Sequence, residues 1–358
     1  MTKLESRMHP IAFREIQKLA MFTDIHFGAR NNSDQHNLDN LEYIDWFIDQ
    51  CKEEQPSHIA FLGDFFENRN AINVRTMDRA AECCRRLNAL NIPIIWIVGN
   101  HDLYHRQDRT IYSTDIFSDL KNFHLVSEPI KLNKDWFVTP YLFRAEYPRL
   151  VADINSSKFV LGHFEFRNFV VTGADRVMDH GPDASDFNGP KYIFSGHFHK
   201  RQVSKNIIYI GNTFPTNFGD AGDKDRGMAI FEVKEDKVEF INYERAPLFF
   251  KTRLSRVISG EFEFPPKSRV RCILDMDIGY SEVQQLRDEM IKGMNLREFS
   301  VEEDLAARKE AIAEGLELEG DLDMSSLDNT VRQLITEGVA PSATIDPGAL
   351  IKLYEELT

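Results

Sequence analysis

The chain has 358 residues, of which 42% are hydrophobic and 28% charged, and its formal net charge at pH 7 is −14. This composition excludes a largely disordered chain, and the length suits one large domain with a smaller one. No run of about eighteen apolar residues occurs and the N-terminal segment is mixed and charged. We therefore expect a cytoplasmic protein with no membrane span and no signal peptide.

Charge is unevenly distributed along the chain. Residues 301–358 carry a net charge of −10, whereas residues 244–271 carry +4. Attraction to phosphate depends on local rather than total charge, so the acidic total does not exclude a nucleic-acid partner. A solvated basic surface is the alternative interpretation of residues 244–271.

The first third of the chain alternates strands and helices. Short apolar runs predict strands, and apolar residues three or four positions apart predict helices. In chain order we predict a strand at 17–22, a polar loop at 31–37, a helix at 38–51, a strand at 58–62, a helix at 74–90 and a strand at 92–98. This order is typical of a layered α/β fold with a largely parallel sheet.

The remainder is richer in strands and changes character near residue 245. Strands are predicted at 136–142, 158–161, 191–194, 206–210, 228–233 and 237–243, and a separate β-α-β unit at 270–276, 281–294 and 296–301. The acidic residues 302–324 predict a linker. Two short amphipathic helices follow, capped at Ser325 or Ser326 and at Asp346. We expect them to dock onto another chain, with packing against the catalytic domain as the alternative.

Five predicted strands end in side chains that bind metals or move protons. They deliver Asp24 and His26, Asp64, Asn100 and His101, His163, and His197 and His199. Glycines at positions 63, 99, 162 and 196 stand before these polar residues and allow tight turns. Because ligands of open α/β sheets lie beyond the carboxyl ends of strands, we expect these side chains to gather in one site.

The donor types indicate the class of metal. Imidazole, carboxylate and amide oxygen without thiolate suit Mn²⁺, Fe²⁺ or Zn²⁺. Seven ligands are too many for one ion with an open position. They suit two ions that share a carboxylate and act on a phosphate ester, with a spare histidine to protonate the leaving group. The four cysteines lack Cys-x-x-Cys spacing, so we expect reduced, buried thiols.

Five motifs occur in order: Asp24-x-His26, Gly63-Asp64, Gly99-Asn100-His101-Asp102, Gly162-His163 and Gly196-His197-x-His199. Through them, residues 17–245 resemble the calcineurin-like metallophosphoesterase superfamily. The resemblance implies a four-layer α/β/β/α sandwich of two mixed sheets. It further implies one metal ion on Asp24, His26, Asp64 and His199, and a second on Asp64, Asn100, His163 and His197. His101 would be the general acid, and Asp102 would orient it.

A longer set of motifs narrows the resemblance. Residues 63–67, 97–103, 209–213 and 226–227 resemble the SbcD-type nuclease subunit of the double-strand-break repair complex, a family with members in large bacteriophages. This implies a Mn²⁺-dependent DNA nuclease, with Mg²⁺, Fe²⁺ or Zn²⁺ as other ions. It would be an exonuclease on duplex ends and an endonuclease on single strands, in the host cytoplasm if a phage encodes it. A phosphomonoesterase or cyclic phosphodiesterase acting on small molecules is the alternative.

The same resemblance implies a domain organisation. Residues 1–245 would form the catalytic core, 246–302 a small DNA-binding cap, 303–324 an acidic linker and 325–358 a helix-loop-helix. Within the last, residues 325–357 would dock on an SMC-like ATPase. A homodimer through helices 38–53 and 75–90 is also expected.

One position departs from the family pattern. Many members carry a second histidine three residues after the bridging aspartate, where this chain has Glu67. A glutamate does not donate a proton at neutral pH unless its pKa is raised, so His101 would carry the acid role alone. His180 lies in a polar loop and receives no role.

Overall fold

The computed structural model describes residues 15–171, 176–303 and 351. The chain divides into two compact units, Met1–Val301 and Glu302–Thr358. Nearly all of the second unit lies outside the described residues, and so do residues 304–324 of the predicted acidic linker and nearly all of the helices predicted for residues 325–357. Glu302 and Glu303, expected at the start of the linker, belong to a strand.

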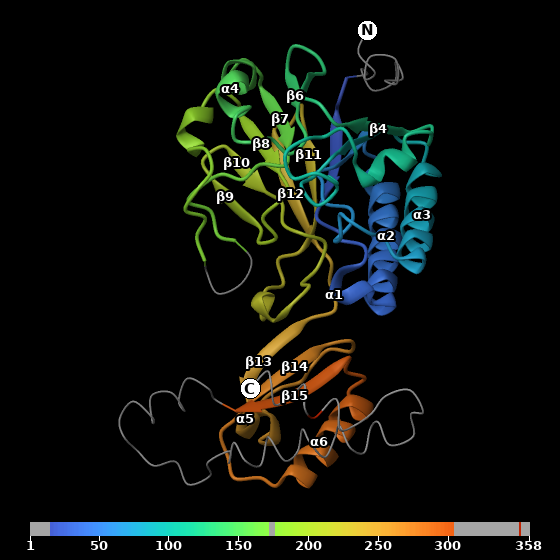
Figure 1. Cartoon of the computed structure of the whole chain (residues 1–358), viewed down its shortest axis with the longest axis vertical. Helices are drawn as coiled ribbons and strands as arrows, with labels where there is room; N and C mark the ends of the chain where they lie inside the picture. The colour runs from blue at the N-terminus through green and yellow to red at the C-terminus, as the bar shows by residue number, and fades with distance from the viewer. Residues whose placement is uncertain (1–14, 172–175, 304–350, 352–358) are drawn as a thin grey trace. The chain divides into compact units, whose positions relative to one another are not determined.

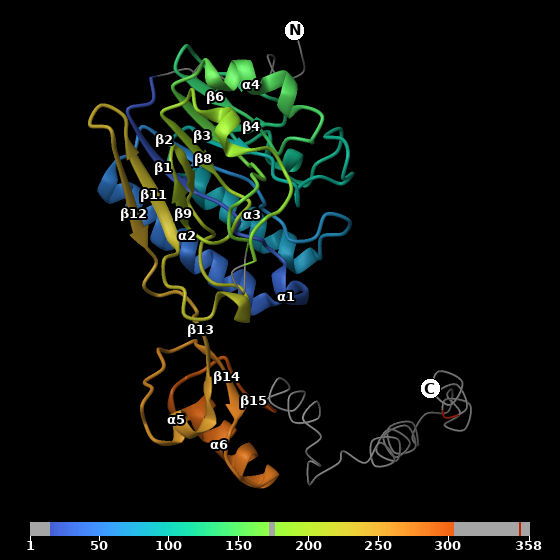
Figure 2. The same ribbon diagram turned by 90° about the vertical axis from the view of Figure 1, so that its left-hand side faces the viewer.

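A six-stranded sheet contains the strands of the first half of the chain. Its order is β12-β11-β1-β2-β3-β4. Strands β1 (Lys18–Phe22), β2 (His58–Phe61), β3 (Ile94–Ile97) and β4 (Phe123–Val126) run parallel, and the hairpin of β11 (Gly227–Glu232) and β12 (Lys237–Asn242) joins antiparallel beside β1. Figure 2 shows this hairpin at the edge of the sheet. The sheet is therefore mixed, as the resemblance implied.

A second six-stranded sheet is built from the middle of the chain. Its order is β5-β6-β7-β8-β10-β9, with a parallel centre. The strands are β5 (Ile130–Lys131), β6 (Trp136–Val138), β7 (Phe159–Gly162), β8 (Tyr192–Ser195), β9 (Gln202–Ser204) and β10 (Ile207–Tyr209). Strands β4, β5 and β9 were not predicted, and the strand predicted at 136–142 ends at Val138.

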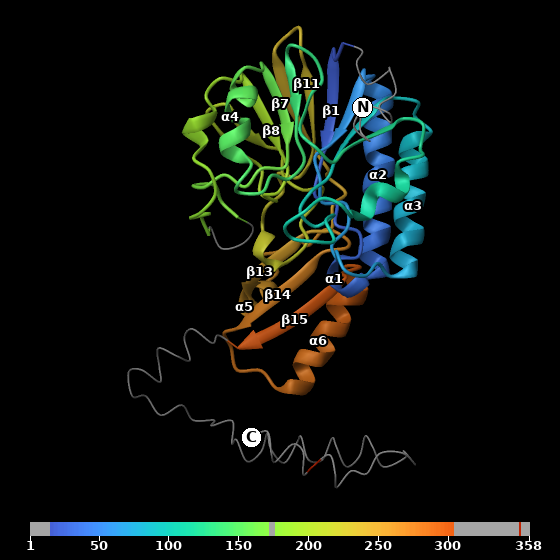
Figure 3. The same cartoon turned by 45° about the horizontal axis from the view of Figure 1, so that its top comes forward.

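Helices cover the outer faces of both sheets, so the molecule has four layers. Helices α2 (Asp34–Glu54) and α3 (Val74–Asn88) lie on the first sheet, and α4 (Tyr147–Asn155) lies on the second. Figures 1 and 3 show α2 and α3 on one side and α4 on the other, with the strands between them. The predicted α/β/β/α sandwich is confirmed. Short 3-10 turns add η2 (Ser113–Phe117), η3 (Ala184–Phe187) and η4 (Phe218–Asp220).

Alternating side chains of the strands fill three cores: one between α2, α3 and the first sheet, one between the two sheets, and one between the second sheet and α4. In β1, Ala20 and Phe22 face α2 and α3, whereas Leu19 and Met21 face the second sheet. Successive side chains of a strand point to opposite faces, so a continuous apolar run suits a strand buried on both sides. This explains why the core strands lack a polar face.

Helix α2 begins earlier than predicted. The expected polar loop at 31–37 is occupied by α1 (Ala29–Asn32) and by the first turn of α2. The side chain of Ser33 caps α2 by accepting from the amide of His36 at 3.3 Å. His36 and Asn37 are polar but buried, and Asn37 binds the amide of Gly28 at 2.8 Å. Because these buried positions are polar, apolar periodicity does not predict the first turn of α2.

The chain after residue 245 forms a smaller sheet with its own core. Its elements are β13 (Phe249–Arg253), α5 (Leu254–Ile258), β14 (Arg269–Leu274), α6 (Tyr280–Gly293) and β15 (Glu298–Glu303), and the sheet order is β13-β14-β15. The predicted β-α-β unit corresponds to β14, α6 and β15, whereas β13 and α5 were not predicted. Val270, Cys272 and Phe299 are buried in this core.

All four cysteines are free of disulfides and buried, so the predicted burial is confirmed: Cys51, Cys83, Cys84 and Cys272. Among the described helices, none is both long and apolar enough to cross a membrane.

Candidate metal centre

The carboxyl ends of five strands meet at one place and deliver all the side chains that the sequence singled out. Strands β1, β2 and β3 are neighbours in the first sheet, and β7 and β8 are neighbours in the second. The pairing of β1 with β2 continues past the strand ends, because the amides of Asp24 and His26 donate to the carbonyls of Gly63 and Asp64 at 3.0 and 3.3 Å. Backbone bonds therefore hold these two ligand loops together.

One group of potential ligands consists of Asp24, His26 and His199. Nε2 of His26 lies 3.1 Å from Nε2 of His199, and each nitrogen lies 3.9 Å from Oδ1 of Asp24. Asp24 is fully buried, and its carboxylate accepts from the hydroxyl of Thr23 at 2.7 Å. Two imidazoles and a carboxylate thus point into a common space.

A second group consists of Asp64, His163 and His197, with Asn100 beside it. Nε2 of His163 lies 3.3 Å from Oδ2 of Asp64 and 3.0 Å from Oδ1 of Asn100. Nδ1 of His197 lies 2.9 Å from the same amide oxygen. The four side chains come from loops after four different strands.

The carboxylate of Asp64 lies between the two groups. Its Oδ2 is 3.3 Å from His163 and 3.9 Å from Nε2 of His26. Its Oδ1 accepts from the backbone amide of His101 at 2.8 Å, which fixes its orientation. A carboxylate in this place could be shared by two adjacent ions.

The ligand loops have an unusual backbone. Four of the seven predicted ligands have a positive φ, namely Asp24 (51°), His26 (50°), Asp64 (60°) and His197 (86°). Residues other than glycine rarely adopt this conformation, and such strain concentrates at functional sites. At Gly99, a Cβ would lie 2.2 Å from Oδ1 of Asp64 and 2.3 Å from its amide nitrogen. Glycine is therefore required there by close packing.

The arrangement of lone pairs fits a bound cation. Nδ1 of His163 contacts the carbonyl oxygen of Leu62 at 2.7 Å and must carry the proton, which leaves a lone pair on Nε2. That lone pair faces the oxygens of Asn100 and Asp64. Acceptors that point at one another repel unless a proton or a metal ion lies among them. The donor set, which contains no sulfur, suits Mn²⁺, Fe²⁺ or Zn²⁺.

The electrostatics of the site favour positive charge. Burial disfavours protonation of His26, but its bond to Glu67 and the charge of Asp64 outweigh burial and raise the pKa of His26 to about 9. For His163, burial is likewise outweighed by Asp64, and its pKa rises to about 9. Burial, together with the charge of His26, holds the pKa of His199 well below its ordinary value. The carboxylates that stabilise these protons would equally attract a divalent ion.

His101 lies beside the first group and forms a third possible metal-binding cluster with His26 and Glu67. Nδ1 of His101 lies 2.7 Å from the carbonyl oxygen of Glu67, and its ring meets the ring of His26 edge-on at 5.0 Å between centroids. The imidazole is partly exposed. Its Nδ1 hydrogen is used by the backbone, so Nε2 is the atom that can exchange a proton with a bound molecule.

Comparison with known proteins agrees with this geometry. A profile of the calcineurin-like phosphoesterase family matches residues 17–201, more than half of the chain. The chain belongs to the calcineurin-like phosphoesterase family. It is therefore a hydrolase of phosphoester bonds, from a family that uses divalent metal ions.

Three curated relatives are similar over much of the chain. Exonuclease subunit 1 of Enterobacteria phage T4 is 26% identical over 230 residues, which cover 63% of this chain and 67% of that protein. The SbcD component of the nuclease SbcCD from Staphylococcus saprophyticus is 25% identical over 290 residues, covering 69% and 72%. The DNA double-strand break repair protein Mre11 of Methanococcus maripaludis is 30% identical over 234 residues, covering 60% and 58%.

Asp102 has a different place in this phosphoesterase from the one expected. It is fully buried, and both of its oxygens accept from backbone amides: those of Asp64, Phe65, Phe66 and Gly99, at 2.9–3.3 Å. The ring of His101 bonds the Glu67 carbonyl instead. Asp102 therefore orients the two ligand loops rather than the imidazole. Burial, reinforced by the charge of Asp64, raises the pKa of Asp102 to about 6.

Two carboxylates beside the metal centre were not predicted as parts of it. Oε2 of Glu67 lies 2.9 Å from Nδ1 of His26. Glu165 lies 3.7 Å from Nε2 of His197 and 3.3 Å from Nε2 of His180, and it accepts from the hydroxyl of Tyr141 at 3.2 Å. The position of Glu67 after the bridging aspartate was a sequence signal for this site. Glu165 lies two residues after His163, and this proximity was its only sequence signal.

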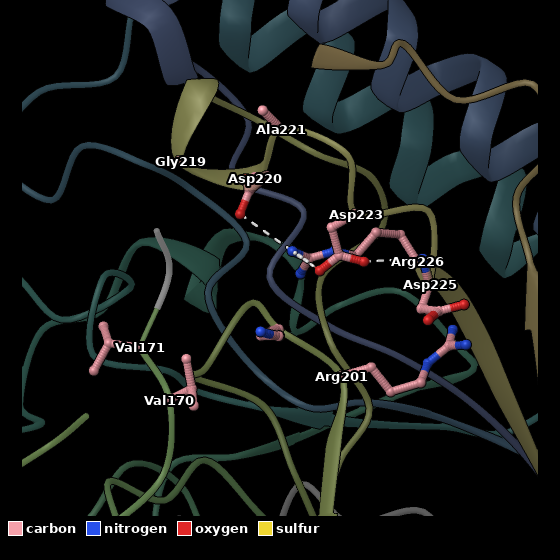
Figure 4. Close-up of a pocket in the computed structure, with 10 residues that line it drawn as sticks. Val170, Val171, Arg201, Gly219, Asp220, Ala221, Asp223, Asp225 and Arg226 are labelled. Atoms are coloured by element: carbon pink, nitrogen blue, oxygen red, sulfur yellow. Dashed lines mark hydrogen bonds and ion pairs between the residues drawn. The ribbon is translucent and has the colours of Figure 1, made fainter. Parts of the chain in front are cut away.

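A pocket of about 390 Å³ has Lys200, the residue after His199, among its lining residues. Figure 4 shows Val170 and Val171 on one side and an acidic and basic network on the other. Arg226 is buried and pairs with Asp220 and Asp223 at 3.1 and 2.8 Å. The two terminal nitrogens of the guanidinium are thus engaged within the wall, and none of the seven predicted ligands lines the pocket.

Proposed function

We propose that this phosphoesterase is a two-metal DNA nuclease of recombination and double-strand-break repair. The observation that carries the proposal is the carboxylate of Asp64, which lies between two groups of imidazole and oxygen donors. The three relatives are an exonuclease subunit, a nuclease subunit and a break-repair protein by name. We expect exonuclease activity on duplex ends and endonuclease activity on single strands.

We assign the ligands in two sets that share one carboxylate. Asp24, His26, Asp64 and His199 hold the first ion, and Asp64, Asn100, His163 and His197 hold the second. When bound, two such ions supply a hydroxide nucleophile and neutralise charge on the phosphate. We propose Mn²⁺ as the ion, and Mg²⁺, Fe²⁺ and Zn²⁺ are the alternatives to be compared with it.

The side chains of this centre then have separate tasks. Asp24 and Asp64 hold negative charge in a buried site, where it attracts cations strongly. His101 presents Nε2 beside the first set and protonates the oxygen that leaves the phosphorus. Asp102 holds the backbone of the loops that carry Asp64 and Asn100.

The small sheet after residue 245 is proposed to bind the DNA backbone. Lys267 and Arg269 are engaged by Glu42 and Glu298, and Arg256 pairs with Glu261. By contrast, the exposed residues Arg245, Lys251 and Arg253 form no ion pair with another described residue. These three are the candidates for phosphate contacts, each of which makes affinity more salt-dependent.

To test the DNA-binding role, Lys251 and Arg253 are replaced by Ala together. Binding of a labelled duplex should weaken and the dependence on salt should become shallower by about two phosphate contacts. Arg256→Ala, which removes a residue already paired with Glu261, is the matched control. An unchanged salt dependence in the double variant would place the DNA elsewhere.

We further propose an SMC-like ATPase as partner of residues 325–357 and a homodimer as the quaternary state. Residues 325–357 lie almost wholly outside the described residues, and the ATPase docking site is proposed from their amphipathic pattern.

The homodimer is supported by large apolar side chains that are exposed: Val74 (86%), at the start of α3, Ile111 (55%) and Ile116 (58%). Co-purification of the ATPase with a chain truncated at residue 324 would refute the docking site, and a monomer in sedimentation would refute the dimer.

The nuclease proposal is tested with the full chain, Mn²⁺ and end-labelled linear duplex, covalently closed duplex and circular single strands, with and without the ATPase. Cleavage of the linear duplex from its ends and of the circular single strand is expected, and the closed duplex should persist. If none of the three DNAs is cleaved, the proposal is refuted. Turnover of a nitrophenyl phosphodiester without DNA binding at low salt would favour the small-molecule alternative.

A further inference from the structure

One residue contacts both the proposed ligand His26 and the proposed acid His101. Oε2 of Glu67 lies 2.9 Å from Nδ1 of His26, and the main-chain oxygen of Glu67 lies 2.7 Å from Nδ1 of His101. The side chain thus holds one imidazole and the main chain holds the other. The two rings stand at 86° to each other with centroids 5.0 Å apart.

Both contacts select the same tautomer. The hydrogen bond to the Glu67 carbonyl requires a hydrogen on Nδ1 of His101, and a carboxylate oxygen 2.9 Å from Nδ1 of His26 favours a hydrogen there. Each ring then presents Nε2 to the centre. Nε2 of His26 is the atom that faces His199 at 3.1 Å and Asp64 at 3.9 Å. For a histidine that binds a metal, a carboxylate on the other nitrogen fixes the ring and increases its basicity.

Glu67 itself is rigidly placed. Its amide donates to the carbonyl of Phe27 at 3.0 Å, and the amides of Phe65 and Phe66 donate to Asp102. Phe65 and Phe66 are fully buried. The Glu67 carboxylate is 44% exposed, and its Oε2 reaches Nδ1 of His26.

We propose that Glu67 is a positioning residue, whose carboxylate sets the tautomer and metal affinity of His26 and whose carbonyl holds the proton donor His101 in register with it. The proposal rests on the proposed function, since it assumes that His26 binds a metal ion. It gives Glu67 a task different from that of the histidine which many family members carry there. The chain thereby ties the first metal site and the proton donor to one short loop.

The test separates the side chain from the main chain. Glu67→Ala removes the carboxylate but keeps the carbonyl, and Glu67→Gln keeps an oxygen that accepts from His26. Glu53→Gln, an exposed acidic residue of α2, is the control. Calorimetric titration of the full chain with Mn²⁺ should show one of two sites weakened about 10- to 100-fold in Glu67→Ala. In Glu67→Gln the same site should be weakened less than about 10-fold.

Kinetics and spectroscopy provide independent readouts. In Glu67→Ala the loss of DNA cleavage should be recovered by excess Mn²⁺, with little change in KM for DNA, because the carbonyl still holds His101. The ¹⁵N spectrum of labelled histidines should keep the signature of a protonated Nδ1 at His101 in wild type and variant, and lose it at His26 in the variant alone.

Three results would overturn the inference: unchanged Mn²⁺ affinity in Glu67→Ala, equal loss at both sites, or a change in the His101 tautomer. Thermal unfolding without metal must be similar in all variants, and if Glu67→Ala unfolds early it is replaced by Glu67→Ser, which also removes the carboxylate and keeps the carbonyl. Failure of the proposed function is distinguishable, because a wild type that binds two ions but leaves DNA intact would still show the effect of Glu67 on metal affinity.

Discussion

The buried carboxylate of Asp102 accepts the backbone amide of Asp64 at 3.1 Å, although the two residues belong to loops after different strands. The same oxygen accepts from Gly99 at 2.9 Å, and the other accepts from Phe65 at 2.9 Å and Phe66 at 3.3 Å. One side chain therefore organises the loop of the bridging carboxylate and the loop of Asn100 together.

Replacing Asp102 by Ala should destabilise the fold strongly. Four amides in a fully buried position would lose their acceptor, and each unsatisfied buried group costs about 1–3 kcal/mol. We expect the free energy of unfolding in urea to fall by at least about 3 kcal/mol. The exposed Asp119→Ala should change it by less than about 0.5 kcal/mol. Equal stability of the two variants would refute the organising role.

Gly99→Ala should damage the centre by steric contact alone. The new methyl group would lie 2.2 Å from Oδ1 of Asp64 and 2.3 Å from its amide nitrogen, so the Asp64 loop must move. We expect a loss of at least about 1–3 kcal/mol in stability and a drop in Mn²⁺ affinity. Gly293→Ala, with no atom within 4 Å of the added carbon, is the control. A Gly99→Ala protein with native Mn²⁺ affinity would show that the Asp64 loop can move without weakening metal binding.

Asp64→Ala should abolish activity because both ligand sets lose their shared carboxylate. We expect cleavage to fall by more than about 100-fold, the upper range for residues that only support a ligand. Calorimetry should show Mn²⁺ binding weakened at both sites. Asp49→Ala, on the exposed face of α2, should bind and cleave normally. Loss of only one site would remove Asp64 from the bridging position.

His101→Ala should separate metal binding from catalysis. Because His101 is not in either of the two proposed ligand sets, Mn²⁺ affinity should be retained while kcat falls about 10²- to 10⁴-fold. His101 also clusters with His26 and Glu67, so the titration decides between an acid and a ligand. His101→Asn keeps a donor that reaches toward the Glu67 carbonyl but lacks Nε2, and it should be equally inactive. His105→Ala, an exposed neighbour, is the control. If His101→Ala fails to bind two ions, His101 is a ligand and not the acid.

The buried thiols should not react with thiol reagents in the folded protein, and they should lower the free energy of unfolding at high pH. Burial raises the pKa of Cys51 and Cys272 to about 12, from the ordinary value of 9.0. Between these values the unfolded state has lost protons that the folded state retains, so stability falls as pH rises from about 9 toward 12. Ellman's reagent at pH 8 should react only after denaturation. A Cys51→Ala, Cys272→Ala protein should show a shallower decline of stability above pH 9.

Local sequence was sufficient to predict the core of this protein. Each ligand follows a short apolar strand and most follow a glycine, and these signals lie within a few residues of one another. The helices α2 and α3 were also visible in their apolar periodicity, except for the first turn of α2, where buried His36 and Asn37 are polar. The small strands β5 and β9 have two and three residues, too few to show a period.

The partners of these side chains were decided by the tertiary structure. Sequence alone placed Asp102 beside His101, yet the packing of two loops gives its oxygens to the amides of Asp64, Phe65, Phe66 and Gly99. The sequence marked Glu67 only as a departure from the family pattern. The parallel pairing of β1 with β2 brings the Glu67 carboxylate to Nδ1 of His26, which lies 41 positions earlier in the chain. A strand pattern is a local property of the chain. The acceptor that a buried hydrogen bond finds depends on which loops the sheets set side by side.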